Sequence, residues 1–397
     1  MTYRLICVRC AVCQPGTGYL TACRQCGGLL VAEYNLGEAM IGPPGQDPFS
    51  RFRDLLPAAP STFPATAEHG ITSTPLIELD AAEATGERAA GVTVYAKWEG
   101  GHPTGSAKDP MAIVALAYMQ ACGVRGFVFS STGNTTAAFA RALAFWPDIT
   151  GHVFVPAGFP PPACPPPNLV VHEASGDYAS SHLAAARHAE RHAGNHHGLV
   201  PEGGFFSIGR REGLKLAYLA ALLDAPAPPT VVVQAVSSGM GILAAGKAAA
   251  ELTALGLLPH QPRLIAVQQE SCAPMVASFL AGAATLRPDD VIPDPDGPAV
   301  ATLLGDPSAS YPYVRDAVLA GGGALAATSA ADIGAAFTHA RWRLGLNICF
   351  SAATALGALP GLRRAGLIRD GDVVLVNLTG SARSAAGQRE LARLAAV

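Results

Sequence analysis

Short apolar segments with β-forming residues alternate along this chain with glycine-containing turns and with stretches rich in alanine and leucine. Six segments are predicted strands, at residues 92–97, 126–130, 152–156, 230–236, 264–268 and 372–378. Each is followed by a turn cluster, and most of these turns lead into a stretch of helical composition. Strands that alternate with helices in this way pair in parallel, so the sequence predicts an α/β fold with a parallel sheet.

Size and charge narrow the class of protein. A chain of 397 residues, 50% of them apolar, can bury a large core in two domains or in one domain with an accessory module. A formal net charge of -3 provides no basic surface for nucleic acid or an acidic membrane. The apolar stretches are too short to span a bilayer, and the N-terminus has no apolar signal region. We therefore expect a cytoplasmic protein with a small-molecule substrate, without nucleic acid or a membrane as a partner.

One polar loop places a lysine at the start of a helix. Residues 102–109 read His-Pro-Thr-Gly-Ser-Ala-Lys-Asp and precede an apolar helical segment. Ser106 and Asp109 have the spacing of a capping box, which puts Lys108 in the first turn. The partial positive charge of a helix N-terminus favours the neutral amine, the form that attacks a carbonyl group. A solvated lysine at a capped helix start is the alternative interpretation.

Three further loops follow predicted strands. Residues 131–136, Ser-Thr-Gly-Asn-Thr-Thr, precede a predicted helix at 137–145 and suit an anionic or carbonyl-bearing ligand. Residues 237–241, Ser-Ser-Gly-Met-Gly, predict a phosphate cup, because glycines let backbone amides approach a phosphate and the serine hydroxyls add donors. Residues 379–381, Thr-Gly-Ser, carry a hydroxyl that can bind a ring nitrogen. Considered singly, each loop is also compatible with a helix cap or a plain turn without a ligand.

Taken in order, the four loops resemble those of the fold-type II pyridoxal 5'-phosphate (PLP) enzymes, within them the threonine synthase and cysteate synthase group. The resemblance implies a tryptophan synthase β-like α/β fold of two subdomains with the cofactor between them, a small N-terminal zinc-ribbon-like module, and a homodimer. The implied module covers residues 1–35. Residues 36–92 and 206–397 would form the larger subdomain, and residues 93–205 a smaller, mobile one.

The resemblance also assigns roles residue by residue. Lys108 matches the lysine that binds PLP as a Schiff base, Asn134 the asparagine at the cofactor's phenolic oxygen, and Thr379 the hydroxyl residue facing the pyridine nitrogen. The cofactor phosphate loop falls on Ser237, Ser238, Gly239, Met240 and Gly241, although the family usually has Gly-Asn in place of the two serines. Candidate ligands for substrate carboxylate or phosphate are Ser131, Thr132, Thr135, Arg210 and, as second choice to Arg210, Arg211.

The subfamily signals are mixed. Residues 175–178, 200–204, 210–213 and 234–236 look like cysteate synthase, whereas the lysine loop and Thr379 are similar to threonine synthase. Cys349-Phe350 stands where threonine synthases have Glu-Pro. The resemblance implies a PLP-dependent lyase or transferase that replaces the phosphate of O-phosphoserine. The alternatives are γ-elimination with water addition on O-phosphohomoserine, a dehydratase, or a non-catalytic binding protein with the same fold.

Cysteine and histidine clusters lie outside the four loops. Cys7, Cys10, Cys23 and Cys26 form two pairs with twelve residues between them, which is zinc-ribbon spacing. We expect structural zinc there, and the alternative is reduced thiols without metal. Cys13 lies outside the two pairs and is not expected to bind the metal. A second cluster comprises His182, His188, His192, His196 and His197. Its spacing partly suits a metal, but a solvated helix face is the interpretation we prefer.

Overall fold

The computed structural model describes residues 3–16, 18–65, 70–86, 91–159, 161–162, 164–176, 178–193 and 198–382. The chain divides into two units. Unit 1 comprises Met1–Ser73 and Lys108–Leu216, and unit 2 comprises Thr74–Ala107 and Ala217–Val397. None of the described helices is both long enough and apolar enough to cross a membrane.

Unit 2 contains a six-stranded sheet of order β12-β11-β10-β13-β5-β4. Neighbouring strands run parallel except β4, which runs antiparallel to β5. Alternate residues of the central strands, such as Val231 and Val233, pack with α11 and α12 in one buried core. The strands are β4 (Leu76–Leu79), β5 (Thr93–Trp98), β10 (Val231–Ala235), β11 (Arg263–Gln269), β12 (Ala324–Thr328) and β13 (Val373–Leu378). The helices are α3 (Ala81–Thr85), α8 (Met240–Ala254), α9 (Pro274–Leu280), α10 (Tyr311–Ala320), α11 (Ala330–Trp342) and α12 (Phe350–Arg364).

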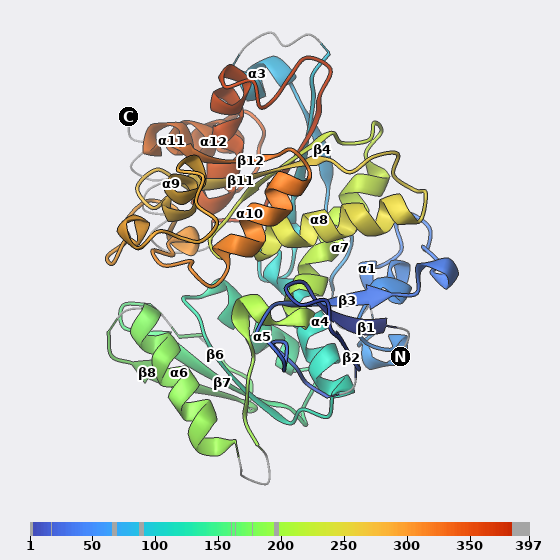
Figure 1. Ribbon diagram of the computed structural model, residues 1–397, viewed down its shortest axis with the longest axis vertical. Helices are drawn as coiled ribbons and strands as arrows, with labels where there is room; N and C mark the ends of the chain where they lie inside the picture. The colour runs from blue at the N-terminus through green and yellow to red at the C-terminus, as the bar shows by residue number, and fades with distance from the viewer. Residues whose placement is uncertain are drawn as a thin grey trace. The chain divides into compact units, whose positions relative to one another are not determined.

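Unit 1 contains a parallel four-stranded sheet of order β8-β7-β6-β9. Phe127 and Phe129 on one face contact Phe139 of α5, whereas Val128 on the other face packs in a core with α6. Figure 1 shows α6, in green, lying across this sheet. The strands are β6 (Gly126–Ser130), β7 (Thr150–Pro156), β8 (Leu169–Ala174) and β9 (Val200–Pro201). The helices are α4 (Lys108–Ala121), α5 (Asn134–Leu143), α6 (Tyr178–His192) and α7 (Ile208–Asp224), whose last residues belong to unit 2.

The N-terminal module of unit 1 is a three-stranded antiparallel sheet of order β2-β1-β3. Its strands are β1 (Tyr3–Cys7), β2 (Cys13–Gln14) and β3 (Leu30–Tyr34), and the short helix α1 (Pro48–Arg51) follows. The Tyr34 hydroxyl donates to Glu212 Oε2 of α7 at 2.9 Å. This module is therefore bonded to the same helix that carries the candidate arginines.

The predicted α/β class is confirmed, but the predicted domain boundaries differ from the division into units. β5 was expected in the smaller subdomain and lies in the large sheet of unit 2, because it pairs along its whole length with β13. Residues 36–73 were expected in the larger subdomain and cluster with unit 1, where Lys215 of α7 donates to the Leu55 carbonyl at 2.8 Å. The pairing of β5 with β13 and the hydrogen bond from Lys215 to the Leu55 carbonyl thus account for the boundaries of the two units.

Candidate functional site

The loop that precedes Lys108 is held against the loop that follows β13. The Ala107 amide donates to the Thr379 carbonyl at 3.0 Å, and the Ser381 amide donates to the Gly105 carbonyl at 2.8 Å. A Cβ on Gly380 would lie 2.9 Å from the same carbonyl oxygen, so these backbones approach too closely for a side chain. Two of the predicted loops therefore meet within unit 2, one residue before Lys108.

Lys108 is the first residue of α4, so the predicted helix start is confirmed. Burial of the amine, together with the positive charge of Arg210, lowers the pKa of Lys108 from its ordinary 10.5 to about 8. Both effects disfavour the ammonium form. A substantial fraction of this amine is consequently neutral near physiological pH, as imine formation and proton abstraction require.

Arg210, one of the predicted anion ligands, already has a buried carboxylate partner. Its Nε donates to Glu202 Oε1 at 2.7 Å, and its Nη2 lies 2.5 Å from Glu202 Oε2. The pair uses two donors of the guanidinium in a bidentate arrangement, which fixes its orientation. Arg210 thus supplies an oriented positive charge that acts on Lys108.

Arg211 has a different environment. Its Nη2 donates to the Leu30 carbonyl of β3 at 2.5 Å, and its Nε donates to the Ser207 carbonyl at 3.4 Å. Both contacts are to backbone groups. Arg211 therefore holds the N-terminal module to α7. The sequence predicted Arg211 as a substrate ligand and did not predict this contact.

Two glycines let α7 approach α4. A Cβ on Gly209 would lie 2.6 Å from the Ala115 Cα, and a Cβ on Gly213 would lie 2.5 Å from the Met111 Cα. Neither position accepts a side chain unless the helices separate. This close packing keeps the first turns of α4 and α7 together, which explains why the charge of Arg210 reaches Lys108.

The Ser131 hydroxyl organises the loop before α5. Its Oγ accepts hydrogen bonds from the backbone amides of Gly133 and Thr136, both at 3.2 Å. Asn134 follows as the first residue of α5. Thr135 is buried and Thr132 is half-buried. The predicted turn is therefore shorter than expected, because Asn134, Thr135 and Thr136 are the first residues of α5, and the Ser131 hydroxyl binds backbone amides of this segment.

The glycine-rich loop of unit 2 leads directly into α8. Gly239, the N-cap residue, has a φ of 88°, and the N-cap has no side-chain hydrogen bond in this described segment. Ser237 and Ser238 on the preceding turn are half-buried. Because the N-cap residue is a glycine, no side chain of that residue caps the first amides of α8. These amides can therefore donate to a phosphate at the helix N-terminus. The residues present fit a phosphate group.

A buried polar network underlies this glycine-rich loop. The Tyr218 hydroxyl donates to Gln234 Oε1 on β10 and accepts from Asn377 Nδ2 on β13 at 2.9 Å. Gln234 Nε2 donates to the Ala235 carbonyl at 2.7 Å, and a Cβ on Gly241 would lie 3.2 Å from the Gln234 Cδ. Sequence reasoning missed Tyr218, because no local pattern predicts that it lies between two strands remote in the chain.

Gly239 provides a test of the glycine-rich loop. A Cβ at this position would lie 2.2 Å from Val314 Cγ2, and the backbone is in the left-handed region. We expect Gly239→Ala to lower the free energy of unfolding by about 2–4 kcal/mol, from strain together with the steric clash. Chemical denaturation followed by circular dichroism measures the change.

Gly256 is the matched control for this substitution. Its φ is +70°, and a Cβ there would have no neighbour within 4 Å. Gly256→Ala should therefore cost only the left-handed strain, about 1–2 kcal/mol. Equal losses for the two variants would show that the contact with Val314 does not constrain the loop.

A buried histidine–carboxylate pair stands at the start of the lysine loop. His102 Nε2 lies 3.0 Å from Glu99 Oε2, and Thr74 Oγ1 donates to Glu99 Oε1. Burial would raise the pKa of Glu99, but the charge and the hydrogen bond of His102 outweigh it and lower that pKa to about 2. His102 is thus held in place by Glu99.

The four predicted metal-ligating cysteines come together in the N-terminal module. Their Sγ atoms all lie within 4.8 Å of one another, with Cys7 and Cys26 at 3.5 Å and Cys10 and Cys23 at 3.7 Å. Four thiolates at about 2.3 Å from a tetrahedral zinc lie about 3.8 Å apart. A Cβ on Gly28 would lie 3.0 Å from the Cys7 Sγ, so the turn wraps closely around the sulfurs. The cluster fits a metal ion.

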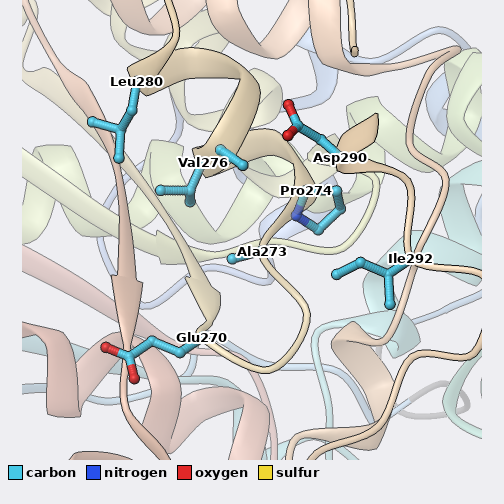
Figure 2. Close-up of a pocket in the computed structure, with 8 residues that line it drawn as sticks. Glu270, Ala273, Pro274, Val276, Leu280, Asp290 and Ile292 are labelled. Atoms are coloured by element: carbon cyan, nitrogen blue, oxygen red, sulfur yellow. The ribbon is translucent and has the colours of Figure 1, made fainter. Parts of the chain in front are cut away.

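A pocket of about 340 Å³ lies in unit 2, away from the predicted residues. Figure 2 shows it between α9 and the following loop, with the carboxylates of Glu270 and Asp290 on different sides. Arg287 Nε donates to Asp290 Oδ2 at 2.8 Å, so one of these carboxylates is already paired. The pocket has no arginine or lysine in its lining, and it does not suit an anionic substrate.

Comparison with protein families gives a match over most of the chain. The family model described as "Pyridoxal-phosphate dependent enzyme" matches residues 67–380. This range contains Lys108, Asn134, the glycine-rich loop and Thr379, whereas the four clustered cysteines precede it.

Curated relatives include cysteate synthases and a threonine synthase. The cysteate synthase of Methanoculleus marisnigri is 30% identical over 272 residues, 65% of this chain and 61% of that protein. The cysteate synthase of Methanocella arvoryzae is 27% identical over 90% of this chain and 86% of its own length. The threonine synthase of Mycobacterium leprae is 28% identical over 83% and 86%. The chain thus spans less than two thirds of the first of these relatives.

Solved structures share the fold. Maize serine racemase has a TM-score of 0.64 at 18% identity, covering 82% of this chain and 92% of the racemase. Threonine deaminase isoform 2 from Solanum lycopersicum has a TM-score of 0.63 at 16% identity, covering 91% and 98%. At these identities the likeness concerns the fold alone.

Proposed function

Since this chain belongs to the family of pyridoxal-phosphate-dependent enzymes, we propose that it replaces the phosphate of an O-phosphorylated amino acid, as a cysteate synthase does with O-phosphoserine. The observation that carries the proposal is the lowered pKa of Lys108 beside the positive charge of Arg210. A neutral amine can serve as a base, and a nearby guanidinium attracts an anionic substrate.

The residues proposed to hold PLP are those that the sequence resemblance assigns. Lys108 would bind it covalently, and the first amides of α8 with the hydroxyls of Ser237 and Ser238 would bind its phosphate. The proposed ring contacts are Asn134 and Thr379. When bound, the cofactor stabilises negative charge at the substrate Cα. A hydroxyl opposite the pyridine nitrogen leaves that nitrogen largely unprotonated, which suits elimination and replacement better than transamination.

The chain's own residues would perform the proton transfers. The Lys108 amine would act as the general base and take the Cα proton of the substrate. The Cβ–O bond breaks and phosphate leaves with its electron pair. Arg210, oriented by Glu202, would stabilise the negative charge of the departing phosphate. A nucleophile such as sulfite then forms a bond to Cβ, and Lys108 returns the proton to Cα. Ser131, Thr132 and Thr135 remain the proposed ligands of the substrate carboxylate or phosphate.

A threonine synthase reaction is the second candidate. The Mycobacterium leprae enzyme is 28% identical and matches 83% of this chain. In that reaction phosphate leaves from Cγ of O-phosphohomoserine and water adds at Cβ. The same lysine base and anion-binding residues would serve both substrates.

Product analysis distinguishes these candidates. The purified protein with PLP is incubated with O-phosphoserine or O-phosphohomoserine, with and without sulfite, and phosphate and amino-acid products are measured. Sulfite-dependent phosphate release from phosphoserine with formation of cysteate supports the first proposal. Threonine from phosphohomoserine supports the second, and no phosphate release from either substrate contradicts both.

Light scattering tests the proposed homodimer, and cell fractionation tests the proposed cytoplasmic location.

The lowered pKa of Lys108 predicts a pH profile for cofactor binding. Only the neutral amine reacts with an aldehyde, and this form accumulates as the pH rises through about 8 instead of 10.5. The rate at which cofactor-free protein binds PLP should therefore rise with pH and level off above about 8. Stopped-flow absorbance measures the rate, with Nα-acetyl-lysine as the unperturbed control. A rate that keeps rising to the pH range of the control would contradict the assignment.

We also propose that Cys7, Cys10, Cys23 and Cys26 hold structural zinc. The supporting observation is that their sulfur separations match a tetrahedral thiolate site. The purified protein should contain one zinc bound in this module, and Cys10→Ser should release it and lower the melting temperature. Cys13→Ser, which changes an exposed cysteine outside the cluster, is the matched control. Metal analysis that finds equal zinc in both variants would refute the proposal.

A further inference from the structure

Three histidines from separate elements of unit 1 converge at the edge of its sheet. His152 lies on β7, His172 on β8 and His188 on α6. The register pairs Phe154 with His172, so His152 and His172 point to the same face of the sheet. This is the face on which α6 packs, since Phe154 shares a core with Ala185 and Ala189 of that helix.

The structure corrects the sequence interpretation of the histidine cluster. His182 is exposed, as a solvated helix face requires, but His188 and His192 contact each other and His188 contacts both strand histidines. His196 and His197 lie outside the described residues. The sequence did not single out His152 and His172, because strand residues meet the helix only through sheet register.

The ring nitrogens approach one another as ligand atoms do. His152 Nδ1 and His172 Nε2 are 3.0 Å apart, and one ligand nitrogen from each of the three histidines lies within 4.8 Å of the other two. His188 Nε2 is buried, with no hydrogen-bond partner among the described residues. Nitrogens bound to one tetrahedral metal at about 2.0–2.1 Å lie about 3.3 Å apart. The three nitrogens, now within 4.8 Å of one another, would draw together to this separation around a bound metal.

The residue types of the cluster favour a transition metal. The neutral imidazole ring is the form that binds a metal. Three imidazoles suit a zinc-class transition metal and not calcium or magnesium, which prefer oxygen.

We propose that His152, His172 and His188 form a binding site for a divalent transition metal, with zinc as the reference ion, separate from the cysteine cluster. The fourth position of a tetrahedral site is left to water, because among the described residues His192 does not belong to the group whose ligand atoms lie within 4.8 Å of one another. Bound metal would join the edge strand β8 to β7 and α6. Its effect would be to stabilise the part of unit 1 that carries the α5 loop.

Aromatic stacking is the competing explanation. The rings of Phe154 and His172 are stacked, with centroids 4.5 Å apart and planes 10° from parallel. Stacking accounts for the position of that one ring. It does not require one nitrogen of each of the three rings to lie within 4.8 Å of the other two, and any aromatic residue would satisfy it.

Zinc titration of the whole protein tests the proposal. The wild-type protein is expected to bind one more Zn²⁺ than His172→Ala, with equilibrium dialysis and metal analysis as the measurement. Loss of one ligand should weaken this second site by more than the roughly 100-fold that loss of an outer-shell partner costs. The matched control is His182→Ala, which removes an exposed histidine from α6, the helix that carries His188, and should keep both zinc ions.

A second measurement uses only the wild-type protein, so it holds if His172→Ala fails to fold. Zn²⁺ should protect His152, His172 and His188 from modification by diethylpyrocarbonate, as located by peptide mass spectrometry, and leave His182 reactive. Equal zinc content in wild type and a folded His172→Ala variant would overturn the site. Absence of protection of these three residues under saturating Zn²⁺ would overturn it as well.

Discussion

Lys108→Ala is expected to abolish both the visible absorption of bound PLP and the release of phosphate. The substitution removes the amine that would bind the cofactor and the base that would take the Cα proton. Loss of the base alone lowers a rate by about 10² to 10⁴-fold, and loss of the covalent attachment adds to this. Absorbance spectra of the purified variant with added PLP and phosphate assays with O-phosphoserine measure the two effects.

Arg4→Ala is the control for this experiment. It removes a positive charge from an exposed pair with Glu33 in the same unit, and both signals should persist. An unchanged absorption band in Lys108→Ala would mean that another group binds the cofactor. An unchanged rate would remove Lys108 from the proposed mechanism.

Lys215→Met is expected to produce the largest loss of stability. The side chain is fully buried, its Nζ lies 2.6 Å from Glu212 Oε2, and it stands 4.5 Å from the centroid of the Tyr34 ring. Methionine fills a similar volume but leaves the Glu212 carboxylate buried without its cation. Breaking a buried pair in this way costs about 3–5 kcal/mol. Urea denaturation followed by tryptophan fluorescence measures the change.

The double variant Lys215→Met/Glu212→Leu separates charge from packing. Replacing both partners by apolar residues should recover much of the lost stability, because no unpaired charge remains. The surface control Arg4→Met should cost no more than about 1 kcal/mol, as exposed pairs do. If the double variant is no more stable than Lys215→Met, packing dominates the role of this lysine.

Six of the thirteen strands in the described residues were predictable, because these six are apolar and mostly rich in valine or aromatic residues. β6 was predicted at its observed limits, and β10 and β13 to within one residue at either end. β12, Ala324–Thr328, was missed because its sequence is mostly alanine, and only pairing with β11 makes it a strand. β8 was missed because its apolar run is short and continues into His172 and Glu173.

The candidate site was predictable where one loop contains the whole signal. The helix start at Lys108 and the turns before α5 and α8 depend on neighbouring residues. Each turn leads into a helix as expected, but α5 and α8 begin at Asn134 and Met240, inside the predicted loops. The Glu202 partner of Arg210 and the position of Tyr218 between β10 and β13 could not be predicted, because they depend on the register of segments far apart in sequence. The three-histidine cluster depends on tertiary structure in the same way.

The glycine-rich loop of unit 2 has a consequence for how such enzymes diverge. Its proposed phosphate donors are mostly backbone amides at the start of α8, and every residue except proline supplies one. Side chains in the turn, including Ser237 and Ser238, can then change over evolution while the phosphate stays bound. Gly239 is the exception, since its neighbour Val314 leaves no room for a Cβ. A motif search that weights the shape of this turn above its side chains should recover distant relatives that a residue-by-residue pattern would overlook.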